Sequence, residues 1–126
     1  MMIVIDTSAL IRFFTNDDPT KAQKVRQLLN SSEKIILQDV VFPELEYVLG
    51  DAYGVTRPEL EKTFWFLISR PNVKINSSVK VALDIFKQTK LDFADCLIVA
   101  QATGKKLASF DKKMLKTVGV SPYWHD

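Results

Sequence analysis

Hydrophobic and polar residues form short blocks along the chain, and these blocks predict strands separated by helices. Residues 2–5, Met-Ile-Val-Ile, form an apolar run that is too short for a helix and rich in β-branched residues. This run predicts a strand buried on both faces. Similar runs predict strands at residues 34–37, 73–75 and 107–110, and the segment 118–124 is a candidate edge strand.

Between these runs, apolar residues three and four positions apart predict helices whose ends carry capping signals. Asp18 before Pro19 is an N-cap residue followed by proline at the first helical position. Thr56 with Glu59 three residues later forms a capping box. The predicted helices cover residues 8–14, 19–29, 40–53, 57–70, 79–86 and 93–103, and a short helix follows Asp111.

This alternation predicts the fold class and the number of domains. Strands that alternate with helices favour an α/β fold with a mainly parallel sheet covered on both faces. The length of 126 residues fits one domain over residues 1–126, and no linker, repeat or low-complexity segment interrupts it. A composition of 47% hydrophobic and 25% charged residues is typical of a soluble globular protein.

Composition also argues against several classes of protein. Cys96 is the only cysteine, so no internal disulfide can form and we expect a reducing, cytoplasmic setting. The apolar opening lacks a basic region and meets Asp6 too soon for a signal peptide, and no apolar run approaches the roughly 20 residues that span a bilayer. His125, the only histidine, argues against a histidine triad or a zinc site, and the four glycines form no phosphate loop.

Four acidic residues stand at positions that suggest chemistry. Asp6 and Asp111 each follow a predicted strand, and the carboxyl ends of parallel strands meet at the edge where α/β folds bind ligands. Glu44 borders the apolar face of the helix predicted at 40–53, for which Asp39 is the expected cap, whereas Glu46 faces away. The fourth acid, Asp95, lies in the first turn of the most apolar predicted helix, three residues after Asp92, the expected cap of that helix.

Each acid also has a purely structural explanation. Asp6 and Asp111 can cap the helices that follow, Asp95 can favour a helix N-terminus by about 0.3–1 kcal/mol, and Glu44 can be a solvated partner of a basic residue. Together, however, two carboxylates about 4 Å apart repel by roughly 4 kcal/mol. Such a cluster needs protons or cations, and hard oxygen ligands select Mg²⁺ or Mn²⁺.

Two polar features near these acids admit both a functional and a structural interpretation. The Thr7 and Ser8 hydroxyl groups are candidate contacts to substrate, or simple capping groups. The net charge of +2 tolerates an acidic partner such as RNA, and five lysines surround Asp111 in the sequence. These are Lys105, Lys106, Lys112, Lys113 and Lys116, which a solvated face explains equally well.

Four segments resemble the motifs of the PIN-domain ribonucleases, especially the toxins of the VapC type. Ile-Asp-Thr-Ser-Ala-Leu (5–10) is similar to the opening motif, and Pro-Glu-Leu-Glu-Tyr-Val-Leu (43–49) resembles the helix with the second acid. Asp-Phe-Ala-Asp-Cys-Leu-Ile-Val-Ala (92–100) resembles the third motif, and Ser-Phe-Asp (109–111) the fourth. The order and spacing of the four make the resemblance specific.

The resemblance implies a PIN-like three-layer sandwich and a divalent-metal-dependent endoribonuclease. Its catalytic and metal-binding acids correspond to Asp6, Glu44, Asp95 and Asp111, with Mg²⁺ or Mn²⁺ as cofactor. Asp92 is ambiguous, because family members often carry an acid near this position although a cap role also explains it. The resemblance further implies homodimerisation and inhibition by a small cognate antitoxin.

We therefore expect an enzyme that cleaves RNA phosphodiester bonds as the toxin of a toxin–antitoxin pair. One alternative is a non-catalytic PIN-like module that binds RNA or protein. A second, weaker alternative is an aspartyl-phosphate phosphotransfer domain. Ser8 stands where such phosphatases have a second aspartate, and Asn76-Ser77 follows the third strand where receiver domains have the acceptor aspartate.

Overall fold

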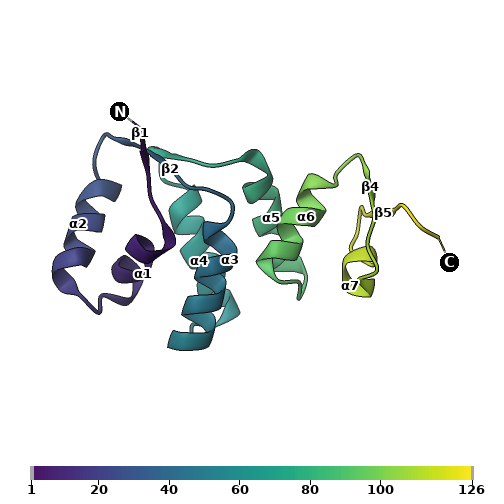
Figure 1. Cartoon of the computed structure of the whole chain (residues 1–126), viewed down its shortest axis with the longest axis horizontal. Helices are drawn as coiled ribbons and strands as arrows, with labels where there is room; N and C mark the ends of the chain where they lie inside the picture. The colour runs from purple at the N-terminus through teal and green to yellow at the C-terminus, as the bar shows by residue number, and fades with distance from the viewer. Residues whose placement is uncertain (1, 126) are drawn as a thin grey trace. The chain divides into compact units, whose positions relative to one another are not determined.

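A computed structural model of the chain describes residues 2–125 and divides it into two compact units, Met1–Asn76 and Ser77–Asp126 (Figure 1). The N-terminal unit holds the first two motifs and the C-terminal unit holds the other two. Neither unit, within residues 2–125, has a helix with the length and apolar character needed to cross a bilayer. The single domain over residues 1–126 stays a prediction.

The N-terminal unit is built on a three-stranded parallel sheet. The strands are β1 (Met2–Val4), β2 (Lys34–Ile36) and β3 (Val73–Lys74), and their order in the sheet is β1-β2-β3. Ile35 in the central strand lies opposite Ile3 on one side and Val73 on the other. The predicted α/β class with a parallel sheet is confirmed, because each crossover between these strands contains helices.

The prediction that the first strand is buried on both faces is wrong. β1 is an edge strand of its sheet, and Met2 and Val4 are 58% and 59% exposed. Ile3 is half-buried and Ile5, which follows the strand, is buried. Successive side chains of a strand point to opposite faces, so this alternation means that only one face of β1 is covered within its unit.

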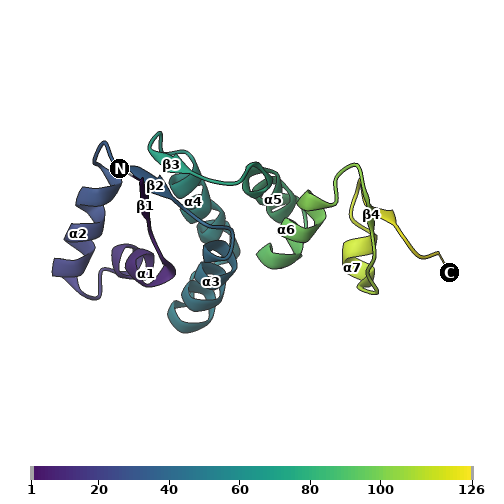
Figure 2. The same cartoon turned by 45° about the horizontal axis from the view of Figure 1, so that its top comes forward.

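Helices surround this sheet, and most of them begin where the capping signals predict. They are α1 (Thr7–Thr15), α2 (Pro19–Leu29), α3 (Val41–Tyr47), the π-helix η1 (Val48–Ala52) and α4 (Arg57–Ile68). Asp18 accepts a hydrogen bond from the Lys21 N–H group, and the Thr56–Glu59 capping box is present. Helices α1 and α2 lie side by side in both views (Figures 1 and 2), and the core between the elements contains Leu10, Ile35, Phe42, Leu45 and Phe64.

The helix predicted at 40–53 differs from the prediction at its start and in its last turns. Asp39 is not its cap: Val40 occupies that position and already has helical dihedral angles, because the Phe42 N–H group bonds to the Asp39 carbonyl oxygen in a preceding turn. From Val48 the α-helix continues as η1, whose wider π-type hydrogen bonding carries the chain to Ala52.

The C-terminal unit pairs two helices and adds a small sheet. Helix α5 (Ser77–Gln88) packs against α6 (Phe93–Gln101), and the rings of Phe86 and Phe93 are 5.4 Å apart. Strands β4 (Lys106–Leu107) and β5 (Ser121–Pro122) are parallel neighbours, which confirms the edge strand expected in the last segment. Between them lies α7 (Lys112–Leu115).

The strand predicted at 107–110 is displaced, so the expectation that Asp111 ends a strand is wrong. β4 ends at Leu107, and Phe110 is 84% exposed rather than buried in a sheet. The Asp111 N–H group donates to Ser109 Oγ, and Asp111 itself caps α7. Only Leu107 of the predicted strand is therefore in a strand, and residues 108–110 belong to the connection that leads into α7.

Candidate active site

Asp6 stands between the end of β1 and the start of α1, as its motif predicts. It is the N-cap of α1, and its Oδ1 atom accepts from the Ala9 N–H group at 3.1 Å and from Ser8 Oγ at 2.8 Å. The backbone hydrogen bond from Ala9, followed by that from the Ser8 side chain, lowers the pKa of Asp6. The side chain is exposed and ionised at neutral pH, so it can bind a cation while it caps the helix.

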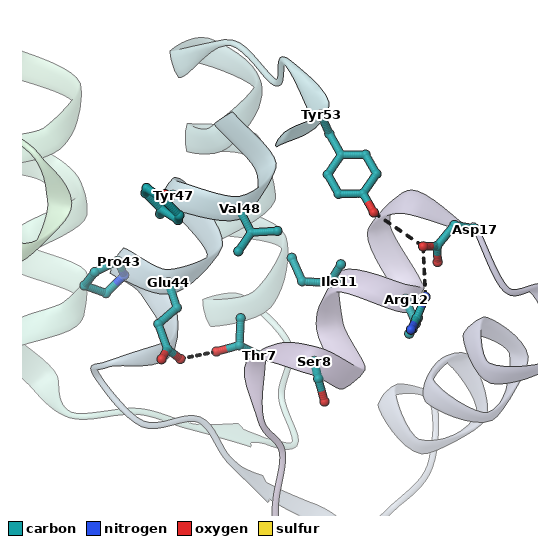
Figure 3. Close-up of a pocket in the computed structure, with 10 residues that line it drawn as sticks. All are labelled: Thr7, Ser8, Ile11, Arg12, Asp17, Pro43, Glu44, Tyr47, Val48 and Tyr53. Atoms are coloured by element: carbon teal, nitrogen blue, oxygen red, sulfur yellow. Dashed lines mark hydrogen bonds and ion pairs between the residues drawn. The ribbon is translucent and has the colours of Figure 1, made fainter. Parts of the chain in front are cut away.

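Glu44 lies in the first turn of α3 and is joined directly to the first motif. The Thr7 hydroxyl group donates a hydrogen bond to Glu44 Oε1, although the two residues are 37 positions apart (Figure 3). Thr7 follows Asp6, and α3 follows β2, so both acids of this unit stand beyond the carboxyl ends of parallel strands. This hydrogen bond brings the first two motifs into contact within the N-terminal unit.

The sequence predicts that Glu44 is the more buried of the two glutamates on this helix, and the structure shows the reverse. Glu44 is exposed, whereas Glu46 is half-buried. The reason is Phe42, which is completely buried and widens the buried side of the helix. Glu46 lies four residues after Phe42 and therefore on nearly the same side of the helix. Exposure next to Thr7 nevertheless leaves the Glu44 carboxylate open to a ligand.

A pocket of about 680 Å³ borders Glu44, and we call it the α1–α3 pocket. Residues from both helices, from the loop after α1, from the start of η1 and from the position just after η1 surround it (Figure 3). They are Thr7, Ser8, Ile11, Arg12, Asp17, Pro43, Glu44, Tyr47, Val48 and Tyr53. Its size is within the range of ligand-binding pockets of about 300–1,000 Å³.

Three polar side chains are hydrogen-bonded to one another in the α1–α3 pocket. Asp17 Oδ2 accepts from Arg12 Nη1 at 2.9 Å and from the Tyr53 hydroxyl group at 3.4 Å. Burial acts to raise the pKa of Asp17, but hydrogen bonds from Arg12 and Thr15 and the charge of Arg12 outweigh it and lower the pKa. Sequence analysis missed this group, because 36 positions separate Asp17 from Tyr53.

The C-terminal unit contains the other acidic motifs, and the negative charges there act on Asp95. Burial is the main cause that raises the pKa of Asp95, and the negative charges of Asp111 and Asp92 raise it further. Asp111 Oδ1 accepts a hydrogen bond from the Met114 N–H group at 3.0 Å, so Asp111 does cap the helix that follows it. Asp92 occupies the N-cap position of α6 without a side-chain capping bond, so the cap role does not account for its side chain.

The donor atoms of these residues suit a hard divalent cation. Carboxylate oxygens are the ligands that Mg²⁺ and Mn²⁺ prefer, and Asp6 and Glu44 in one unit and Asp95 and Asp111 in the other supply them. In neither unit, across residues 2–125, do three acidic, histidine or cysteine side chains form a group that could hold a metal ion. Cys96 is buried in α6 and takes no part in this chemistry.

The family model of the PIN domain matches residues 3–120, and the chain therefore belongs to the PIN domain family. The match runs through both units and all four motifs, and it confirms the PIN-like α/β fold expected from the sequence. PIN domains are generally nucleases and typically use divalent metals, which makes a nuclease the enzyme class that the family indicates. A comparison with curated proteins gives no match.

Proposed function

We propose that this PIN-domain protein is a metal-dependent endoribonuclease that cleaves phosphodiester bonds of RNA with Mg²⁺ or Mn²⁺. The observation that carries the proposal is the hydrogen bond from Thr7 to Glu44. It joins two of the four acidic motifs beyond the carboxyl ends of β1 and β2, where α/β folds bind their ligands. Family membership over residues 3–120 supports the same class of reaction.

In this proposal Asp6 and Asp95 are the principal metal ligands, directly or through water. Glu44 and Asp111 complete the acidic set by positioning the cation or orienting a water molecule. When bound, a divalent cation makes a coordinated water more acidic and neutralises charge on phosphate oxygens. Thr7 keeps the Glu44 carboxylate in place, and Ser8 does the same for Asp6.

We extend the proposal to the biological role. The protein would be the toxin of a VapC-type toxin–antitoxin pair, act in the cytoplasm as a homodimer, and be inhibited by a small cognate antitoxin. This part rests on the resemblance of the four motifs. Its test is co-purification with the product of a neighbouring short reading frame that encodes a DNA-binding N-terminus and a disordered tail. The absence of such a neighbour would contradict it.

Cleavage of RNA in the presence and absence of metal tests the proposed reaction. Purified protein incubated with total RNA and Mg²⁺ or Mn²⁺ should produce discrete fragments, and EDTA should abolish them. Cleavage that persists in EDTA would contradict the metal dependence. Binding of RNA without cleavage under all these conditions would instead support the non-catalytic alternative.

A further inference from the structure

The α1–α3 pocket extends beyond what a cation at Glu44 needs. Glu44 and Thr7 stand at one end, whereas the Arg12–Asp17–Tyr53 group stands at the other (Figure 3). Apolar atoms of Ile11 and Val48 line the space between these ends, and Pro43 lies beside Glu44 (Figure 3). A pocket with apolar walls and a few convergent polar groups is the usual form of a small-ligand site.

Two tyrosine rings make the pocket suitable for a flat aromatic ligand. Tyr47 is 70% exposed and Tyr53 is 47% exposed, and both line the pocket. Unpaired RNA bases bind proteins mainly by stacking on such rings, and each stacked base contributes about 1–3 kcal/mol. The rings are therefore open to a base that enters from solvent.

The polar end of the pocket has the hydrogen-bonding groups that a guanine base requires. Both bonds to Asp17 reach Oδ2, and a carboxylate has about four acceptor positions, so Asp17 can accept further N–H groups. Its lowered pKa keeps it an acceptor at neutral pH. Arg12 has five N–H donors, and arginine is the commonest partner of the guanine O6 and N7 atoms.

We propose that the α1–α3 pocket binds one unpaired base of the RNA and prefers guanine. The base would stack on Tyr47 and Tyr53, donate N–H groups to Asp17 and accept from Arg12. This inference rests on the proposed ribonuclease function, because Glu44 is both a proposed metal ligand and a wall of the pocket. The charged pair at its polar end favours a base over an apolar polypeptide segment, because such a segment would shield the pair from water and offer it no further hydrogen bond.

Equilibrium binding of short RNAs in EDTA tests the pocket without any cleavage. The probes are fluorescein-labelled uridine hexamers with one guanosine, adenosine, cytidine or inosine in the middle, and a hexamer of uridine alone. Wild type should bind the guanosine probe about tenfold more tightly than the others, equivalent to about 1.4 kcal/mol. Inosine should lose affinity because it lacks the N2 amino group.

Two pocket variants separate stacking from base recognition. Tyr47→Ala, which leaves the Arg12–Asp17–Tyr53 group intact, should weaken binding of every probe about tenfold, because stacking tolerates any base. Asp17→Asn should retain binding of the uridine probe but lose the preference for guanosine. Tyr123→Ala and Asp51→Asn, which change exposed residues outside the pocket, are the matched controls and should bind like wild type. Thermal melts of each variant verify folding.

Several results would overturn the inference. These are an absence of binding, equal affinity of wild type for all probes, or a guanosine preference that survives in Asp17→Asn. Unchanged affinities in both pocket variants would mean that a polypeptide or no ligand occupies the pocket. Incubation of wild type with the same probes and Mg²⁺ tests the ribonuclease separately. A base preference without cleavage would contradict only the proposed reaction. Cleavage without a base preference would contradict only the proposed base-binding pocket.

Discussion

At the scale of single residues, two of the four acids have a structural role that does not conflict with the proposed chemistry. Asp6 and Asp111 are both N-caps, and each uses Oδ1 for a backbone hydrogen bond. A carboxylate has more acceptor positions than one cap consumes. A capping acid can therefore also bind a metal ion, and a substitution can separate the two roles.

Asp6→Asn should abolish RNA cleavage without unfolding the protein. Asparagine caps helices about as well as aspartate, so α1 keeps its start, whereas the negative charge that binds a cation is lost. We expect an unchanged circular dichroism spectrum and loss of fragments from RNA incubated with Mg²⁺. A variant that cleaves RNA like wild type would remove Asp6 from the mechanism.

The stability difference between Asp95→Asn and wild type should depend on pH. Folding raises the pKa of Asp95, so the folded wild type binds this proton more tightly than the unfolded chain does. The free energy of unfolding of wild type therefore falls as the pH rises from the ordinary pKa of 3.8 through the raised pKa. In EDTA the variant should therefore melt above wild type at about pH 7, and the difference should shrink near about pH 3.5. Thermal melts at both pH values measure this difference.

The control for this experiment is Asp84→Asn, which changes an exposed acid on α5. Its melting temperature relative to wild type should change little between the two pH values. A difference for Asp95→Asn that stays constant with pH would mean that the burial and neighbouring charges around Asp95 do not act on its ionisation.

At the scale of secondary structure elements, α3 is where prediction and structure differ most instructively. The apolar pattern located the helix, but Phe42 widens its buried side, and the π-turns of η1 follow Tyr47. Glu46 becomes half-buried for this reason, while Glu44 stays exposed beside Thr7. Contact with Thr7, rather than burial, is therefore what distinguishes Glu44.

Paired substitutions on α3 test this distinction. Glu44→Gln should cripple RNA cleavage, because it removes the negative charge beside Thr7, and should leave the melting temperature nearly unchanged at this exposed position. Glu46→Gln should retain cleavage. Rates measured on the same RNA with Mg²⁺ compare the two. The opposite ranking would mean that the second motif is assigned to the wrong acid.

At the scale of the whole molecule, a metal that binds only the folded state has a thermodynamic signature. It adds RT ln(1 + [L]/Kd) to the free energy of unfolding, about 1.4 kcal/mol at tenfold excess over Kd. Wild type should therefore melt at a higher temperature in Mg²⁺ or Mn²⁺ than in EDTA, and Asp95→Asn should show a smaller shift because it lacks one ligand. Equal shifts in the two proteins would exclude Asp95 from the metal site.

The sequence by itself determined those features that depend on neighbours along the chain. The order of strands and helices, the Asp18 and Thr56 caps and the parallel sheet all follow from local periodicity and capping chemistry. Asp6 was predictable at the start of α1 for the same reason, because a strand end and a helix cap are both read within a few residues. The four motifs were likewise sufficient to indicate the PIN family.

Only the tertiary structure decided which side chains meet. The bond from Thr7 to Glu44 and the Arg12–Asp17–Tyr53 group join residues 36 or 37 positions apart, and they exist because α1 packs against α3. The partial burial of Glu46 has a similar cause, because Phe42 on its side of the helix packs against Phe64 of α4. No local period of hydrophobic residues encodes such contacts, since a helix pattern specifies which side is apolar but not which neighbour covers it.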